Sequence, residues 1–366
     1  MTKQADFKRR VRARMAKTGE SYAAARRHLL GEPDGPDLDW MAEALHVSNG
    51  DATDLPGTGL ARRLIYWRDV LHEGPVPAVG SAELRRIRAA FLIGAGADDR
   101  REGEQMFAER DRILEANREG EYVLWFEADL YDQLQVIQVL SRLAELGVPA
   151  GRITLICIGE HPEIARFGGL GELRPDQLRE LPATKACKRL TPAALDLATR
   201  AWAALRAPEP SRLGTIAATR STDLRFLGEA FDRLSRKYPS TRDGLSLTER
   251  RILAAVADGA PDAGTAFTRL WRRETRPYLG DTFCFDMIRR LTEAPDPLLR
   301  ADATDDGHVD RLTRLRLTAT GARVLAGEAD HVALNGVDRW IGGVHLHGRH
   351  VRWRWDEGTE AVTTTT

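Results

Sequence analysis

The sequence predicts an α/β fold: a parallel Rossmann-like sheet domain, a helical segment and a winged-helix-like C-terminal domain. Two observations predict the sheet: four buried-strand patterns recur between residues 46 and 160, and helical patterns lie between the later ones. A third observation predicts the C-terminal domain, since three helical patterns precede two short strand patterns between residues 245 and 330. We therefore divide the chain into residues 1–39, 40–190, 191–244, 245–330 and 331–366.

The composition is that of an ordinary soluble protein. The 366 residues are 42% hydrophobic and 30% charged with a formal net charge of zero, so any affinity for nucleic acid must come from a local patch. No apolar stretch approaches the roughly 20 residues of a membrane helix, and the N-terminus lacks the apolar core of a signal peptide. Cys157, Cys187 and Cys284 are odd in number and far apart, which excludes a disulfide framework. We expect a cytoplasmic protein with no membrane partner.

Residues 1–39 are predicted to be a basic helical extension followed by a linker. Nine lysines and arginines fall within the first 30 residues, against Asp6 and Glu20, and a second short helix is expected after Gly19. The stretch from Gly31 to Asp39 is rich in Pro, Gly and Asp, as linkers are. Two interpretations of the basic residues stay open: an arm that contacts nucleic-acid phosphates, or a solvated helical pair.

The sheet domain is expected at residues 40–190. Its four strands begin the segments HVSNGD (46–51), LIYWRDVLHEGP (64–75), YVLWFEADLYDQ (122–133) and ITLICIGE (153–160). A tight turn at 56–59 separates the first two strands, and residues 81–118 have the apolar spacing of two helices. An amphipathic helix follows the third strand and ends at Gly147, and a Gly-rich loop at 167–181 enters a helix at Pro175.

The remaining elements follow from similar patterns. Residues 191–244 form a helical connector with a break at 206–214. The winged-helix-like domain at 245–330 begins with a helix for which we expect Thr248 as the N-cap and Arg251 three residues further on, and its other helices are expected at 263–273 and 281–291. Residues 331–366 are expected to form a hairpin and a frayed tail.

Polar and mostly acidic side chains follow each of the four predicted strands. In open α/β sheets ligands bind outside the carboxyl ends of the strands, so we expect these side chains to share one pocket. The candidate ligand-binding residues are Asn49, Asp51, Arg68, Asp69, Glu73, Gln133 and Glu160, and the candidate catalytic residues are His72, Glu127 and Asp129.

Each candidate has an expected role and an open alternative. Arg68 has the forked guanidinium that binds a phosphate or carboxylate, although pairing with Asp69 or Glu73 explains it as well. His72 is the candidate proton carrier, because imidazole titrates near neutrality. Glu127 and Asp129 are candidates for an acid/base pair or for ligands of Mg²⁺, the one cofactor that these residue types suggest. Alternatively, Asp129 or Asp132 caps the helix that follows.

Several established kinds of site lack their sequence motifs. The patterns HExxH, GxxxxGK[ST], GxGxxG, GxSxG and CxxC do not occur in the chain. His345 and His347 share a face of the predicted C-terminal hairpin, but we find no carboxylate or cysteine spaced to complete a metal site there.

Six motifs in order resemble a bacterial family known only as a domain of unknown function, paired with a second such domain towards the C-terminus. They are HVSNGD, WRDVLHEGPVP, LWFEADLYDQLQ, FGGLGEL, PSTRDGLSLTER and LNGVDRWIGGVHL, and the similarity around them spans roughly residues 40–356. The basic start resembles an N-terminal helical extension of assorted actinobacterial proteins. The resemblance implies that the two domains and their polar motifs belong together, and it implies no reaction.

Two functions from different classes follow. The leading hypothesis is an enzyme or ligand-binding protein for a small phosphorylated or nucleotide-like molecule. The rival is a DNA-binding regulator that uses residues 245–330 and the basic residues 1–30; the predicted helix at 281–291 offers Arg289 and Arg290 for this, but also Asp281 and Asp286, which repel phosphates. A non-catalytic adaptor that docks partners through residues 190–240 is a third hypothesis.

Overall fold

The computed structural model describes residues 3–19, 25–26, 29–30, 38–94, 100–302 and 308–365. Most of the expected linker at 31–39, most of the second N-terminal helix, and most of the polar turn at 305–308 lie outside the described residues. Packing divides the chain into two interleaved units. The sheet unit comprises residues 1–68, 113–127 and 146–192, and the helical unit comprises residues 69–112, 128–145 and 193–366.

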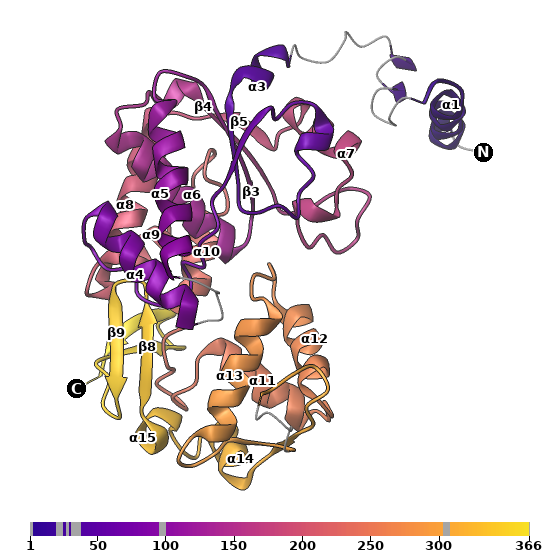
Figure 1. Cartoon of the computed structure of the whole chain (residues 1–366). Coiled ribbons are helices and arrows are strands. Elements are labelled where there is room, and N and C mark those ends of the chain that lie inside the picture. Colours follow the sequence, from indigo (N-terminus) through magenta and orange to yellow (C-terminus); the bar gives the residue numbers. More distant parts are fainter. Residues whose placement is uncertain are drawn as a thin grey trace. The chain divides into compact units, whose positions relative to one another are not determined.

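A five-stranded sheet organises the described part of the sheet unit. Its strands are β1 (Leu45–Ser48), β2 (Arg63–Tyr66), β3 (Tyr122–Glu127), β4 (Ile153–Ile158) and β5 (Cys187–Arg189), in the order β2-β1-β3-β4-β5 (Figure 1). β1 is parallel to both β2 and β3, and β3 is parallel to β4, so the predicted parallel sheet is confirmed. β5 is antiparallel to β4 and was not predicted. After β1, the chain adds β2 on one side of that strand and then β3 on its other side. The topological switch point therefore lies between β1 and β3.

One face of this sheet packs against short helices of the same unit. These are α3 (Asp39–Glu43), η1 (Pro56–Thr58), η3 (Leu170–Glu172), α7 (Pro175–Glu180) and η4 (Leu181–Ala183), with η2 (Ala150–Arg152) preceding β4. Trp125 on β3 and Ile156 on β4 share the apolar cluster with Leu170 and Leu178. The alternation of such residues along β3 explains why this face is buried.

The buried His46 on β1 is a structural residue. Its Nδ1 accepts a hydrogen bond from Nε1 of Trp125 at 2.9 Å, and its Nε2 lies 2.8 Å from the carbonyl oxygen of Met41. Burial lowers the pKa of His46, which keeps the imidazole neutral and able to accept from the indole.

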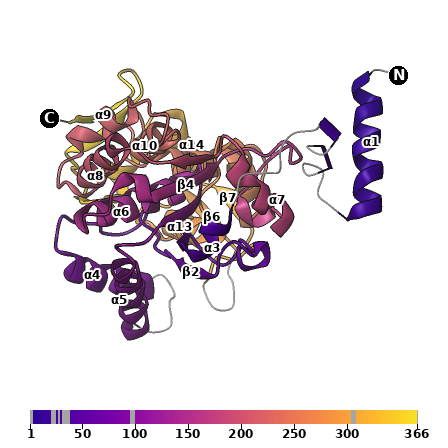
Figure 2. The same ribbon diagram turned by 90° about the horizontal axis from the view of Figure 1, so that it is seen from above.

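Helices dominate the first half of the helical unit. They are α4 (Ser81–Gly94), α5 (Arg100–Ala116, whose last turn belongs to the sheet unit), α6 (Leu130–Glu145), α8 (Pro192–Arg206), α9 (Leu213–Ala217) and α10 (Leu227–Ser235), with the short η5 (Pro210–Arg212) between α8 and α9. α4 and α5 lie side by side (Figure 2), where Arg85 pairs with Asp111 at 2.9 Å. α10 packs against both α6 and α9. The two helices expected at 81–118 and the amphipathic helix after the third strand are confirmed.

The winged-helix-like domain has its own core. Helices α11 (Leu247–Ala257), α12 (Ala263–Arg273) and α13 (Asp281–Glu293) precede the antiparallel strands β6 (Leu299–Ala301) and β7 (Leu315–Leu317), and α14 (Ala319–Ala326) closes it. Figure 1 shows these helices. Buried Ile252, Leu270 and Ile288 come from successive helices and belong to one apolar cluster. A bridge between Asp262 and Arg314 adds the short strand segment that winged helices carry before the second helix.

The expected cap of α11 is wrong by two residues. The N-cap is Ser246, whose Oγ accepts from the backbone N–H of Glu249 at 3.3 Å. Glu249 in turn accepts the backbone N–H of Ser246 at 2.8 Å, which completes a capping box. Thr248 is buried inside the first turn, where its hydroxyl accepts from Arg233.

The expectation of a frayed C-terminal tail is also wrong. After α15 (His331–Asn335), strands β8 (Val337–Ile341) and β9 (Val344–Gly348) form the predicted hairpin. β10 (Trp353–Asp356) then pairs with β11 (Ala361–Thr364), so the tail is a strand in antiparallel register. Because β-branched valine and threonine favour extended backbone, this segment pairs once a partner strand is available. In the described part of the chain, which also includes α1 (Lys3–Thr18), we find no helix with the length and apolar character needed to span a membrane.

Candidate functional site

Two of the predicted ligand-binding residues meet at the carboxyl edge of the sheet unit. Arg68 lies just past β2 and Asp51 follows β1, and a guanidinium nitrogen of Arg68 lies 2.8 Å from a carboxylate oxygen of Asp51. Arg68 thus pairs with Asp51, not with Asp69 or Glu73 as the alternative proposed. Both side chains stay exposed, at 45% and 73%, so the pair is accessible to a ligand.

Glu127, at the end of β3, holds the Gly-rich loop in place. Its Oε1 accepts the backbone N–H of Leu170 at 2.7 Å. Gly169 has φ 154°, and a Cβ built there would lie 2.4 Å from Oε2 of Glu127. Only glycine fits this close approach. The structure thus gives Glu127 a positioning contact, and its role as a base stays a prediction. Asn49 is half-buried and Glu160 is exposed after β4.

The WRDVLHEGP motif continues into the helical unit, where Asp69 forms a buried ion pair. Nε and Nη2 of Arg88, on α4, donate to Asp69 Oδ1 at 2.9 and 2.8 Å, and both side chains are 1% exposed. Arg88 also donates to the carbonyl oxygens of Val70 (2.8 Å), Glu73 (2.7 Å) and Pro75 (3.2 Å). One guanidinium therefore fixes the backbone of the whole segment.

His72 sits inside that clamped segment, 3% exposed. Among the described residues neither ring nitrogen has a hydrogen-bond partner, and the ring packs edge-on against Tyr278 with centroids 5.0 Å apart and against Tyr131 at 5.7 Å. Burial lowers the pKa of His72 well below its ordinary value, and the charges of Lys237, Arg88 and Arg233 add to this. The imidazole is therefore neutral at pH 7. Its role as a proton carrier stays a prediction.

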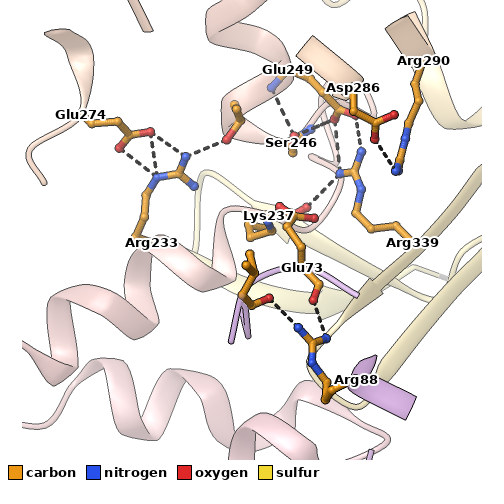
Figure 3. A network of polar contacts seen from close by, with 12 residues as sticks. Glu73, Arg88, Arg233, Lys237, Ser246, Glu249, Glu274, Asp286, Arg290 and Arg339 are labelled. Atoms are coloured by element: carbon orange, nitrogen blue, oxygen red, sulfur yellow. Dashed lines mark hydrogen bonds and ion pairs between the residues drawn. The ribbon is translucent and has the colours of Figure 1, made fainter. Parts of the chain in front are cut away.

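A network of buried ion pairs surrounds the motif (Figure 3). Lys237 pairs with Glu73, and Arg339 of β8 pairs with Glu249 of α11. Glu249 is buried, which by itself raises its pKa, but the adjacent Arg339 and further charges and hydrogen bonds outweigh this and lower it to about 2. Glu249 is therefore held in charged form by its partners, and Glu73 has a cation of its own in Lys237.

The acids that follow Glu127 mark the start of α6. Oδ1 of Asp129 accepts the backbone N–H of Asp132 at 3.0 Å, so Asp129 caps the helix, as one alternative expected. Asp132 and Gln133 are buried in the first turn. A catalytic role of Asp129 and a ligand-binding role of Gln133 stay predictions.

The structure also contains a cavity that sequence reasoning did not find. Its volume is about 270 Å³, and its lining comes from four regions of the helical unit: Ala128 and Leu130 at the start of α6, residues 229–236 on α10, residues 247–251 on α11, and residues 274–276 after α12. The described lining includes four arginines and three carboxylates, namely Arg233, Arg236, Arg251 and Arg276 with Glu229, Asp232 and Glu274. We call it the arginine cavity.

The most buried charges of the arginine cavity are Arg233 and Glu274. Nε and Nη2 of Arg233 donate to the Glu274 carboxylate at 2.7 to 3.2 Å, and their side chains are 12% and 6% exposed. Arg251 approaches the same carboxylate at 2.7 Å. Nη1 of Arg233 is buried and has no hydrogen-bond partner among the described residues. Two guanidinium groups thus share one carboxylate, which leaves the group positively charged.

The other charges around the cavity are more exposed. Arg236 pairs with Asp232 at 2.9 Å, and Arg276 pairs with Glu229 at 3.2 Å. The sequence did hold a signal, because Glu229, Asp232, Arg233 and Arg236 are spaced as i, i+3, i+4 and i+7 and so share one face of α10. Arginines gathered at a concave, partly desolvated surface favour an anionic ligand that they can bind through paired N–H groups.

Comparisons with known proteins add little to this geometry. No family model matches the chain, and no curated protein matches it. Among solved structures, the chain is similar to the ORC1 protein of Aeropyrum pernix in complex with DNA, with 16% sequence identity, 79% of this chain and 91% of that chain covered, and a TM-score of 0.18. At that score the two structures do not superpose as wholes, so neither the fold nor DNA binding is transferred from it.

Proposed function

We propose that this protein binds a small phosphorylated ligand and that its phosphoryl group occupies the arginine cavity. The observation that carries the proposal is the charge of the cavity: its described lining has four arginines and three carboxylates. An excess cation in a partly desolvated site is costly unless an anion joins it. A phosphoryl group provides that charge, and its three oxygens match the forked donors of arginine.

The start of α6 also lines the cavity, through Ala128 and Leu130, and Leu130 is the first residue of this 16-residue helix. The first turn of a helix presents backbone N–H groups that favour anions. In α6, however, Asp129 already accepts the backbone N–H of Asp132. The positive charge offered to a ligand therefore comes from the four arginines.

The volume of the cavity limits the ligand. Small-molecule pockets typically enclose about 300–1,000 Å³. At about 270 Å³ the arginine cavity lies just below that range, which favours a small phosphorylated metabolite over a dinucleotide. Asp51 and Arg68 in the sheet unit stay a separate predicted ligand-binding position.

The test measures thermal stabilisation by inorganic phosphate and pyrophosphate, with ionic strength held constant by sodium chloride. The variants are Arg251→Gln and Arg276→Gln. Both keep Arg233, the most buried arginine of the cavity. In Arg251→Gln, Glu274 also keeps its contact with Arg233. Arg200→Gln is the matched control, since Arg200 forms an exposed pair with Asp196 at 3.0 Å on α8, outside the cavity.

We expect phosphate to stabilise the wild-type protein and the Arg200 variant, by about 2.7 kcal/mol when its concentration is 100 times the Kd. The same addition stabilises the Arg251 and Arg276 variants less, although both fold. Equal stabilisation in all four proteins, or none in the wild type with either phosphate or pyrophosphate, rejects the proposal.

The winged-helix-like domain gives weaker support to the rival hypothesis of DNA binding. On α13, Arg290 pairs with Asp286 at 2.6 Å, and Arg289 pairs with Asp286 at 2.7 Å and also with Glu293. These acids already neutralise the two arginines that DNA phosphates would otherwise contact. A salt-dependent gel shift that survives deletion of residues 1–30 tests the rival directly; its appearance supports DNA binding by residues 245–330.

A further inference from the structure

The β8–β9 hairpin brings three metal-ligating side chains together on one exposed face. The strands are joined at Gly342 and Gly343, and the register pairs Asp338 directly with His347. His345 lies two residues before His347 and therefore points to the same face of β9. We expected no carboxylate near these histidines, and this was wrong, because Asp338 comes from the opposite strand.

The distances within the cluster suit a single ion. Nε2 of His345 lies 2.7 Å from Oδ1 of Asp338, and Nδ1 of His347 lies 3.7 Å from Oδ2. One ligand atom from each residue lies within 4.8 Å of the other two. An ion bonded to two atoms at about 2.1 Å in tetrahedral geometry holds them about 3.4 Å apart, so side-chain rotations that move these atoms by about an ångström close the cluster.

The surroundings orient the ligands without covering them. The ring of Trp340 stacks on His345 with centroids 4.4 Å apart and an interplanar angle of 2°. The side chains of His345, His347 and Asp338 are 38%, 72% and 70% exposed, which leaves room for water at the remaining coordination positions. Arg290 is the nearby cation that acts on Asp338, and its own pair with Asp286 offsets its charge.

We propose that Asp338, His345 and His347 form a binding site for a divalent transition-metal ion of the Zn²⁺ and Cu²⁺ class. The two imidazoles are borderline nitrogen ligands, and they select these ions over Mg²⁺ and Ca²⁺, which prefer oxygen ligands alone. Three protein ligands with open positions for water are the pattern of an accessible zinc site, in contrast to the closed four-ligand structural sites. This site is independent of the arginine cavity and of the ligand proposed for it.

Binding is tested on the full-length chain with any purification tag removed, because polyhistidine tags bind the same ions. Calorimetric titration with Zn²⁺ gives affinity and stoichiometry. Titration with Cu²⁺ is followed by tryptophan fluorescence, because a bound paramagnetic ion quenches a ring stacked on its ligand. The variant Trp340→Phe keeps the ligands and removes that local signal, so it assigns the quenching to this hairpin.

The ligand variants are Asp338→Asn, His345→Phe and His347→Gln, and His350→Gln is the control, because His350 is an exposed histidine just beyond β9. We expect one Zn²⁺ per chain, at least about tenfold weaker binding in each ligand variant, and unchanged binding in the control. In Trp340→Phe the quenching decreases while Zn²⁺ binding persists. Unchanged Zn²⁺ affinity in His345→Phe and Asp338→Asn, equal weakening in the control, or effective competition by equimolar Mg²⁺ overturns the proposal.

Discussion

Arg88 is the position at which the structure makes its largest stability prediction. Its guanidinium neutralises Asp69, which is 1% exposed, and donates to three backbone carbonyls between residues 70 and 75. The variant Arg88→Met keeps most of the side-chain volume and removes every donor. Breaking a buried pair by removing one partner costs about 3–5 kcal/mol, because the other charge stays buried without compensation.

Urea denaturation of Arg88→Met, Asp69→Asn and the double variant measures this cost. We expect the double variant to be less destabilised than the sum of the two single variants, because the uncompensated carboxylate is absent from it. Arg85→Met is the control on the same helix: Arg85 pairs with Asp111, but its side chain is 28% exposed, so its loss costs at most about 1 kcal/mol.

A local measurement separates clamping of the segment from general destabilisation. Hydrogen exchange at the amides of residues 70–74 is expected to accelerate in Arg88→Met more than exchange in β8 and β9, because the carbonyls of this segment lose their donors. Equal destabilisation by Arg88→Met and Arg85→Met, or additive losses in the double variant, would refute the account of a buried clamp.

Three further predictions concern the sheet unit, the ion-pair network and the hairpin. Gly169→Ala places a methyl group against Glu127 in a backbone conformation that disfavours side chains, and we expect limited proteolysis to cut the loop at 167–173 faster. The pKa of Glu249 is about 2 in the folded state, below its unfolded value. Its stabilising contribution is therefore present above about pH 4.3 and is lost as the pH falls towards 2. We expect Arg339→Met to lower the stability at pH 7 and to weaken this dependence on acid in denaturation curves. Gly343→Ala builds a Cβ 2.1 Å from a carbonyl oxygen of α8, so we expect a lower Tm by calorimetry than for Gly280→Ala, where the same Cβ meets open space.

The sequence predicted the parallel sheet because its signal is local. β3 and β4 are almost entirely buried and mostly apolar, apart from Glu127 and Thr154, and such runs mark strands covered on both faces. β5 is only three residues long and carries Lys188 and Arg189, so it has no apolar pattern to recognise. β11 is rich in threonine and becomes a strand through its pairing with β10. Elements that form strands only through pairing with a partner, and not through an apolar pattern of their own, were the ones that the sequence did not reveal.

The candidate site residues show the same contrast between contacts that a local pattern predicts and contacts that only the fold creates. The shared edge of parallel neighbouring strands, which was predicted, brings Asp51 and Arg68 together, although their ion pair was not predicted. The partner of Asp69 is Arg88, 19 residues away on a helix, and no periodicity selects that arginine among the many in this region. The arginine cavity combines regions from residue 128 to residue 276, so only the fold brings them together. The hairpin cluster, by contrast, was predictable, since a two-residue turn at Gly342 and Gly343 fixes the pairing of Asp338 with His347.

The charges of the helical unit change the chemistry expected of its motifs. The acidic residues of the strand-end motifs suggested a site that binds a cation, but Asp69 and Glu73 each contact a buried arginine or lysine, as does Glu274 in the arginine cavity. In the described network, Arg233 and Arg251 share one carboxylate, which leaves positive charge uncompensated. The neutral imidazole of His72 has Tyr278 as its nearest aromatic ring, and the ring of Tyr278 also lies 5.0 Å from the guanidinium of Arg233. A bound anion stabilises a nearby imidazolium, so the phosphorylated ligand that we propose next to Arg233 would raise the pKa of His72. The predicted role of His72 as a proton carrier would then depend on the same ligand.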